Sequence, residues 1–221
     1  TTAIRQFAKE PLAPEYEQLF VAPVVIAAGR LAHEKGYHHL VRAFSAVHKR
    51  IPAARLAVIG DGELREKLKR LVQELGLEDS VHFLGWQENP FKYIARARIC
   101  TLASRREGLP GVLLEALACG TPVVSVDCRS GPREIIAPAT DPLFQTKQVE
   151  QGEYGVLLPV CDGKWRDASQ PLVAEERMMA DALIGLLENE ESRLRFAEKG
   201  ELRARDFDIK TIAPQWSFLW E

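Results

Sequence analysis

The sequence predicts an α/β protein built as a three-layer sandwich, with a parallel six-stranded sheet between two layers of helices. From Val24 onward, short β-branched runs alternate with longer amphipathic segments. The short runs are apolar at consecutive positions, which is typical of strands buried on both faces. Alternation of such strands with helices produces a parallel sheet covered on both sides.

Composition and charge are those of a water-soluble globular protein. Hydrophobic residues make up 46% of the 221 residues and charged residues 27%, with a net charge of −2. This balance gives no electrostatic reason to expect a nucleic-acid partner. The four cysteines are widely spaced and form no C-x-x-C pair, which indicates reduced residues in a cytoplasmic protein. They are Cys100, Cys119, Cys128 and Cys161.

The first half of the chain alternates three strands with two long helices. The strands are the apolar runs VVIAAGR, ARLAVIG and VHFLG, at 24–30, 54–60 and 81–85. Apolar residues at helical spacing predict a first helix over 36–50. A second helix over 63–76 ends at Gly76, a residue type that favours helix termination.

The second half continues the alternation and ends in helices. The apolar runs ICTLAS, PVVSVDC and YGVLLPV predict strands at 99–104, 122–128 and 154–160. A short helix is expected over 90–98, a helix over 111–120, and a helical turn at 132–136. The segment 137–153 has no periodicity and is expected to be a long surface loop. Between 173 and 207 the apolar periodicity suffices for two helices.

Ligands of parallel sheets bind outside the carboxyl ends of the strands. The loops that follow the strands are therefore the candidate binding segments. They are Gly29–Gly36, Gly60–Glu63, Gly85–Asn89, Ser104–Gly111 and Asp127–Arg133.

Two cations occupy the loop after the first strand. Arg30 and Lys35 lie between Gly29 and Gly36, which allow a tight backbone path. A guanidinium and an ammonium at a strand's carboxyl end can neutralise a diphosphate. The alternative is that both are solvated loop cations paired with Glu34.

The next loops allow ordinary structural explanations beside functional ones. In GDGE, the glycines permit a turn and Asp61 can cap the following helix. Trp86, after the third strand, can pack on a nucleobase or be a half-buried aromatic residue. The absence of G-x-G-x-x-G after the first strand argues against a dinucleotide dehydrogenase. Three neighbouring histidines lack a zinc-binding spacing, so no metal site is expected: His33, His38 and His39.

The stretch SRREGLPGVLLEALACG carries two carboxylates around a glycine-rich helix start. The turn Gly108–Gly111 precedes the helix, and a helix N-terminus favours phosphate. Glu107 stands just before it, where simple capping is an alternative. Glu115 has apolar neighbours, so its carboxylate needs a partner, and adjacent sugar hydroxyls would suit it. A phosphate flanked by hydroxylated groups is the outline of a nucleotide sugar.

Several motifs together resemble a known family. GRLAHEKGY, AVIGDGE, VHFLGW and the stretch Ser104–Ile136 are similar, in this order, to the carboxy-terminal donor-binding domain of GT-B retaining glycosyltransferases of family 4. The resemblance runs from about Val24 to Phe207 and implies a Rossmann-like fold that forms one half of a GT-B enzyme. At Ala97–Arg98 the chain departs from the Ala-Asp that is frequent in the family.

The resemblance also implies a division of the chain. Residues 1–22 would be a linker or the start of the domain, and 23–205 the nucleotide-sugar-binding domain. Residues 206–221 would form a crossover helix toward an amino-terminal, acceptor-binding domain of the same protein. Trp216 and Trp220 on that helix would then be exposed.

Individual roles follow from the same resemblance. Arg30 and Lys35 match the cations on the donor diphosphate, Glu107 matches the glutamate that orients the transferred sugar, and Glu115 matches the ribose-binding glutamate. The remaining residues of the implied donor site are Gly29, Gly60, Gly85, Trp86, Gly108, Leu109, Pro110 and Gly111. Neither a metal nor a cofactor is implied.

The implied reaction transfers a hexosyl or N-acetylhexosaminyl group from a nucleotide-diphosphate sugar, with UDP favoured, to a glycan or glycolipid. It would retain anomeric configuration, need no metal and serve bacterial polysaccharide or lipopolysaccharide biosynthesis. The full-length enzyme would be cytoplasmic, with peripheral association at the inner face of the membrane, and the present chain alone would bind donor without transferring sugar. Two alternatives share the fold: a nucleotide-sugar epimerase and a non-catalytic nucleotide-binding module.

Overall fold

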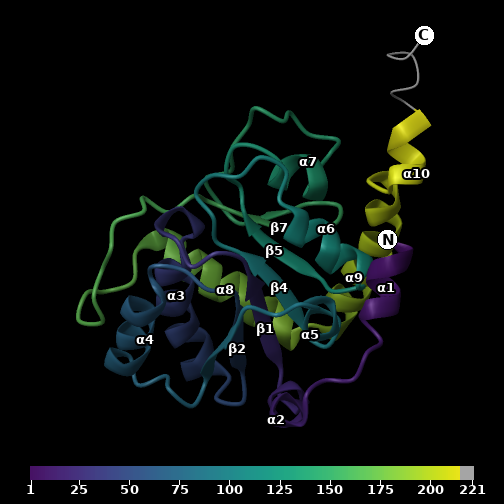
Figure 1. Cartoon of the computed structure of the whole chain (residues 1–221). Helices are drawn as coiled ribbons and strands as arrows, with labels where there is room; N and C mark the ends of the chain where they lie inside the picture. The colour runs from purple at the N-terminus through teal and green to yellow at the C-terminus, as the bar shows by residue number, and fades with distance from the viewer. Residues whose placement is uncertain (215–221) are drawn as a thin grey trace.

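The computed structural model describes residues 1–214 as a seven-stranded sheet between two layers of helices (Figure 1). The strand order is β3-β2-β1-β4-β5-β7-β6, and every pairing is parallel except that of β6 with β7. The strands are β1 Val24–Ala28, β2 Arg55–Ile59, β3 Val81–Gly85, β4 Ile99–Leu102, β5 Val123–Val126, β6 Glu150–Gln151 and β7 Gly155–Leu158.

The order of the strands creates a switch point at the centre of the sheet. The chain proceeds outward from β1 to β3 and then returns to the other side of β1 with β4. The loops that leave β1 and β4 therefore diverge toward opposite faces. A crevice opens between such loops at the carboxyl ends of the two strands.

The two faces of the sheet bury separate apolar cores. Val25 points into a core with helices α3 and α8, whereas the next residue, Ile26, points into a core with α5, α6 and α7. This alternation is the two-residue period of a strand buried on both sides. The helices are α3 Tyr37–Arg50, α4 Arg65–Glu74, α5 Phe91–Ile94, α6 Gly111–Ala118, α7 Pro132–Ile136, α8 Ala174–Glu188 and α9 Glu190–Asp206.

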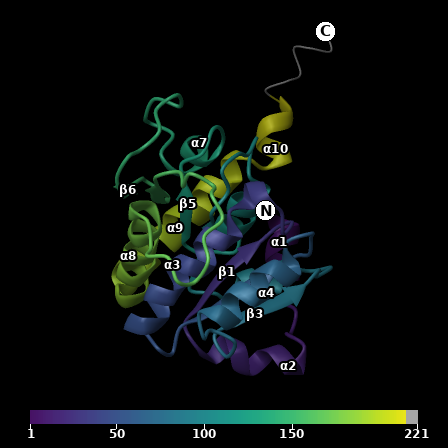
Figure 2. The same ribbon diagram turned by 90° about the vertical axis from the view of Figure 1, so that its left-hand side faces the viewer.

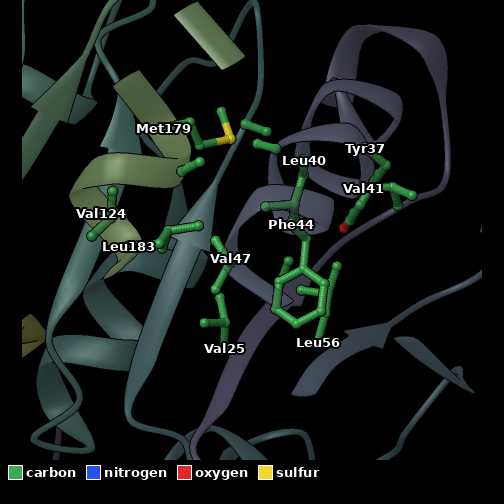
Figure 3. Close-up of a cluster of buried hydrophobic side chains, with 14 of the residues drawn as sticks. Val25, Tyr37, Leu40, Val41, Phe44, Val47, Leu56, Val124, Met179 and Leu183 are labelled. Atoms are coloured by element: carbon green, nitrogen blue, oxygen red, sulfur yellow. The ribbon is translucent and has the colours of Figure 1, made fainter. Parts of the chain in front are cut away.

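Helix α3 packs beside α8 on one face of the sheet. Figure 3 shows Phe44 and Val47 of α3 beside Val25, with Leu183 of α8 completing the contact. The same interface contains a buried ion pair, in which Glu176 of α8 contacts His39 Nδ1 at 2.8 Å and Arg42 Nε at 3.0 Å. A charge buried at such an interface requires this pairing.

Most of the predicted elements are confirmed, with shorter bounds. The main difference is β6, a two-residue antiparallel strand inside the segment 137–153, which was expected to be a loop; the sheet thus has seven strands rather than six. A strand of two residues is too short to show a pattern of alternating apolar and polar residues in the sequence. The two expected C-terminal helices are α8 and α9.

The structure also contains short helices and 3-10 turns, most of them near the chain ends. The structure has α1 Thr2–Phe7, α2 Pro14–Glu17 and α10 Ile209–Ile212, and 3-10 turns at η1 Gln18–Val21 and η2 His33–Lys35. Figure 2 shows α2 at one end of the molecule and α7 and α10 at the other. The expected exposure of Trp216 and Trp220 concerns residues outside those described. Within 1–214, no helix has the length and apolarity needed to cross a membrane.

Candidate functional site

A pocket of about 510 Å³ opens at the switch point between β1 and β4. We refer to it as the β1–β4 pocket. The structure brings the predicted site residues together in its lining, with the exceptions of Gly85 and Gly108. The predicted residues that line it are Gly29, Arg30, Lys35, Gly60, Trp86, Glu107, Leu109, Pro110, Gly111 and Glu115.

Three glycines join the loops at one side of the pocket. The Gly29 N–H donates to the carbonyl of Ile59 at 2.9 Å, and the Gly60 N–H donates to the carbonyl of Gly85 at 2.8 Å. A Cβ on Gly60 would lie 2.0 Å from the Gly29 carbonyl oxygen, so only glycine fits there. Gly85 therefore supports the pocket from behind its lining.

Lys35 and Glu107 form an ion pair across the pocket. Lys35 Nζ lies 2.7 Å from Glu107 Oε1, and the two side chains are 25% and 12% exposed. The pair depends on Gly36, whose φ of 66° brings the loop after β1 against the backbone of Ala103 at the end of β4. Lys35 and Glu107 are 72 residues apart in sequence, and the fold places their charged groups at the same point of the pocket.

Two structural alternatives are resolved by these contacts. Arg30 pairs with Glu34 at 2.6 Å, which is the structural alternative considered for the two loop cations. Arg30 nevertheless also lines the pocket. Lys35 instead pairs with Glu107. Helix α6 has no side-chain cap, so the capping explanation for Glu107 is wrong.

The N-terminus of α6 faces the same pocket. Pro110 is the N-cap in an extended conformation, and both Gly111 and Val112 line the pocket. The first N–H groups of a helix lack intrahelical partners and carry a partial positive charge. The Lys35 ammonium and this helix start therefore favour an anion at one place.

Glu115 carries an unusual carboxylate one turn into α6. It lines the pocket, and burial raises its pKa. Within residues 1–214, no hydrogen bond or ion pair involves its side chain. A desolvated carboxylate without a protein partner is suited to accept hydrogen bonds from ligand hydroxyls.

The opposite wall of the pocket is formed by the loop after β3. Trp86 is 74% exposed, so the half-buried alternative is wrong and its ring is free to contact a ligand. Beside it, Gln87 donates to the Leu84 carbonyl at 2.7 Å and accepts from the Tyr93 hydroxyl at 2.9 Å. These two bonds hold the Gln87 amide in one orientation.

Two residues in or next to the lining make contacts that the sequence did not predict. Asp61 accepts from the Gly62 N–H at 2.7 Å and pairs with Arg65 at 3.1 Å, whereas Leu64 occupies the N-cap of α4. Tyr93 does not line the pocket but contacts the lining residue Gln87, and it was not predicted because a tyrosine in a short helix carries no functional signal by itself. Its closeness in sequence to Trp86 was the available signal.

The neighbouring histidines contact other side chains. His38 stacks between His33 and Trp165, with ring centroids 5.4 and 5.1 Å away, and His39 pairs with Glu176. Among the residues that the structure describes, no group of histidine, cysteine or acidic side chains has the arrangement to hold a metal ion.

Comparisons with known proteins identify the family of the chain. The family model "Glycosyl transferases group 1" matches residues 20–156. An uncharacterized glycosyltransferase of Methanocaldococcus jannaschii is 39% identical over 99% of the chain and 54% of its own length. The Campylobacter jejuni enzyme N-acetylgalactosamine-N,N'-diacetylbacillosaminyl-diphospho-undecaprenol 4-alpha-N-acetylgalactosaminyltransferase is 31% identical over 86% of the chain and 44% of its own length. The chain thus spans about half of each relative.

Solved structures share the fold. The crystal structure of Anabaena HepE with UDP-glucose aligns with a TM-score of 0.74 over 95% of this chain and 53% of HepE, at 24% identity. S. aureus TarM with UDP aligns with a TM-score of 0.75 over 90% of this chain and 36% of TarM, at 20% identity. The fold is therefore the Rossmann-like half of a GT-B protein, and the chain belongs to the glycosyl transferases group 1 family.

Proposed function

We propose that this chain is the donor-binding part of a glycosyltransferase that takes a sugar from a nucleotide-diphosphate sugar, with UDP as the nucleotide. The acceptor would be a glycan or glycolipid in polysaccharide or lipopolysaccharide biosynthesis, bound by a second domain. The observation that carries the proposal is the Lys35–Glu107 pair of 2.7 Å, formed in the pocket onto which the N-terminus of α6 opens.

The ion pair suggests how donor binding proceeds. A diphosphate at the start of α6 would draw the Lys35 ammonium away from Glu107 and leave that carboxylate free for the hydroxyls of the transferred sugar. Arg30 is 67% exposed and pairs with Glu34 of the same loop, so it can turn toward the same phosphates. Fixed cations would stabilise the charge that develops on the departing diphosphate without a metal.

In the proposal, two further residues bind the nucleoside part of the donor. Glu115 would accept hydrogen bonds from the ribose hydroxyls, and Trp86 would cover the base. Of the two neighbouring structures named above, one contains UDP-glucose and the other UDP, which favours uridine as the nucleoside. We further propose retention of anomeric configuration and a site of action at the cytoplasmic face of a membrane.

A thermal-shift panel tests the proposal. UDP, GDP, ADP, UDP-glucose and UDP-N-acetylglucosamine would be titrated against the wild-type chain and Glu115→Ala. We expect uridine nucleotides to raise the Tm of the wild type and to raise that of the variant much less, because stabilisation follows ligand occupancy. Equal stabilisation of both proteins would remove Glu115 from ribose binding, and no shift with any nucleotide would reject donor binding.

Product analysis separates the proposal from its alternatives. The chain incubated with a UDP-sugar alone should leave the sugar unchanged, whereas an epimerase would convert it. A non-catalytic module would bind UDP and a UDP-sugar equally, because it has no use for the Glu107 carboxylate. Transfer to an added acceptor at the rate of a complete enzyme would contradict the need for a second domain.

A further inference from the structure

The segment SGPREII, which follows β5, contains a buried arginine that no donor-site role uses. Arg133 of α7 is 4% exposed and lies between two carboxylates. Its Nη2 contacts Asp127 Oδ2 at 2.6 Å and Glu150 Oε2 at 2.7 Å. We call Arg133, Asp127 and Glu150 the Arg133 cluster. A guanidinium that satisfies two carboxylates in a water-poor site has one well-defined position.

The Arg133 cluster joins three parts of the chain. Asp127 follows β5, Arg133 belongs to α7 and Glu150 forms part of β6. The intervening loop is fixed to the same atoms, because the Thr146 N–H donates to Asp127 Oδ2 at 2.7 Å. The Phe144 ring lies 4.9 Å from the guanidinium carbon and covers it. The long loop is thus anchored rather than free.

Asp127 and Arg133 also bound a short segment that lies against Glu107–Gly111, which forms part of the lining of the β1–β4 pocket. In this loop, the Arg129 carbonyl accepts from the Glu107 N–H at 3.3 Å. The Ser130 N–H donates to the Glu107 carbonyl at 3.1 Å. The backbone that carries the Glu107 carboxylate is therefore hydrogen-bonded to a loop that the Arg133 cluster closes.

The loop after β5 is also closely packed against Gly108 and Pro110. The Ser130 hydroxyl donates to the Gly108 carbonyl at 3.4 Å. A Cβ on Gly131 would lie 2.3 Å from the same carbonyl oxygen and 2.5 Å from Pro110 Cδ. Close-packed segments of this kind transmit a displacement instead of absorbing it. A shift of the loop after β5 would move the Glu107–Gly111 segment.

We propose that Arg133 is a positioning residue of the donor site. By pairing with Asp127 and Glu150, it holds the loop after β5 against Glu107–Gly111, so that the Glu107 carboxylate and the start of α6 face one ligand. The proposal rests on the proposed function. In this proposal the segment 137–149 supports the donor site indirectly, through its contacts with the Arg133 cluster.

A purely structural role for Arg133 would predict a different pattern, and the chain offers a matched control. Arg203 of α9 donates to the carbonyls of Glu134 and Ile135, at 2.6 and 3.2 Å, and so holds the C-terminal end of the same helix α7. Its hydrogen bonds do not reach Asp127 or the loop after β5. Arg133→Met and Arg203→Met both weaken the attachment of α7, but only the first loosens the loop behind Glu107.

The test compares wild type, Arg133→Met, Arg133→Lys and Arg203→Met by calorimetry with UDP, by Tm, and by the backbone amide NMR shifts of Glu107 and Gly108 without ligand. We expect Arg133→Met to bind UDP at least tenfold more weakly and to move both amides. Arg203→Met should stay within twofold of wild type and leave both amides in place. Arg133→Lys should recover part of the affinity, because its ammonium can reach one carboxylate.

The outcomes are decisive in both directions. If Arg133→Met keeps the affinity and the amide positions of wild type, or if Arg203→Met changes them equally, Arg133 has no positioning role. If Arg133→Met does not fold, Arg133→Lys decides by the same two readouts. A wild-type chain that binds no nucleotide rejects the proposed function, while the ligand-free amide comparison still decides whether Arg133 positions Glu107–Gly111.

Discussion

The Glu115 carboxylate is expected to favour ligand binding at the expense of the stability of the ligand-free fold. Burial raises its pKa, which means that the folded chain penalises the ionised carboxylate. For a carboxyl group whose folded pKa is raised, this penalty is complete above the folded pKa and disappears as the pH falls below the unfolded value of 4.5. A ligand that supplies hydroxyl donors would remove the penalty at neutral pH.

Glu115→Gln should therefore stabilise the ligand-free chain at pH 7 and weaken UDP binding. A gain of about 1 kcal/mol would raise the Tm by about 2–4 °C in a chain of this size. The gain should shrink toward pH 4 as wild-type Glu115 becomes protonated. Glu74→Gln, an exposed change in α4, is the control and should alter neither quantity. A destabilised Glu115→Gln protein that binds UDP normally would contradict the assignment.

At the scale of residues, the sequence predicted the members of the β1–β4 pocket but not their pairings. The apolar neighbours of Glu115 were enough to predict an unsatisfied carboxylate. The contact of Lys35 with Glu107 was not predictable, because it depends on how two loops approach. Arg133 was visible only as part of a motif, since its partner Glu150 lies in a segment without periodicity.

At the scale of elements, Gly36 decides how the loop after β1 meets β4. Its φ is 66°, and a Cβ would lie 2.2 Å from the carbonyl oxygen of Ala103. Gly36→Ala should lower the free energy of unfolding by about 3 kcal/mol through backbone strain and collision. The change would also separate Lys35 from Glu107, so UDP affinity should fall with stability.

Gly185 provides the matched opposite case. It lies within α8, and a Cβ there would meet nothing within 4 Å. Gly185→Ala should raise the free energy of unfolding by about 1 kcal/mol, because alanine is the better helix former. Urea denaturation of both variants measures the difference directly. Similar midpoints for the two variants would show that the conformation of Gly36 imposes no constraint.

The elements themselves were predictable to different degrees. Strands such as β1 and β2 are readily predicted from the sequence, because their consecutive buried positions require apolar residues. Helix α5 is shorter than expected and ends at Ile94, since the residues after it form turn hydrogen bonds to Tyr93 and Ile94. β6 has only two residues, and its pairing with β7 comes from tertiary contacts rather than from its own pattern.

At the scale of the whole molecule, His38 links global stability to pH. Its ring is buried, both ring nitrogens lack hydrogen-bond partners among residues 1–214, and burial lowers its pKa to about 3. His39, His33 and Lys67 add positive charge nearby, and Glu176 opposes them. The folded-state pKa lies below the unfolded value of 6.5, so the unfolded chain binds the extra proton. Stability is thus lost as the pH falls from 6.5 toward 3.

His38→Phe should flatten this acid-side decline. The aromatic ring can keep its place between His33 and Trp165 without a group to protonate. Urea unfolding at pH 7, 6, 5 and 4 should give a slope that is smaller than that of wild type by up to about 1.4 kcal/mol per pH unit. Parallel stability curves for the two proteins would rule out His38 as a source of the acid sensitivity.

The arrangement of the whole sheet selects one pocket from several. A larger hollow of about 940 Å³ lies between residues 15–23 and the start of β3, at the amino ends of the strands. None of the predicted site residues lines it. Size alone would have chosen this hollow, whereas the strand order and the placement of charged loops indicate the β1–β4 pocket.

The small strand β6 also affects how copies of the chain behave toward one another. All four residues of β7 are buried, and β6 occupies the side of β7 that faces away from β5. Without β6, the backbone of an apolar strand would be open to pairing with a strand of another molecule. Because Glu150 ties β6 to Arg133, we expect that loss of this ion pair would expose the edge of β7 as well as loosen the loop after β5.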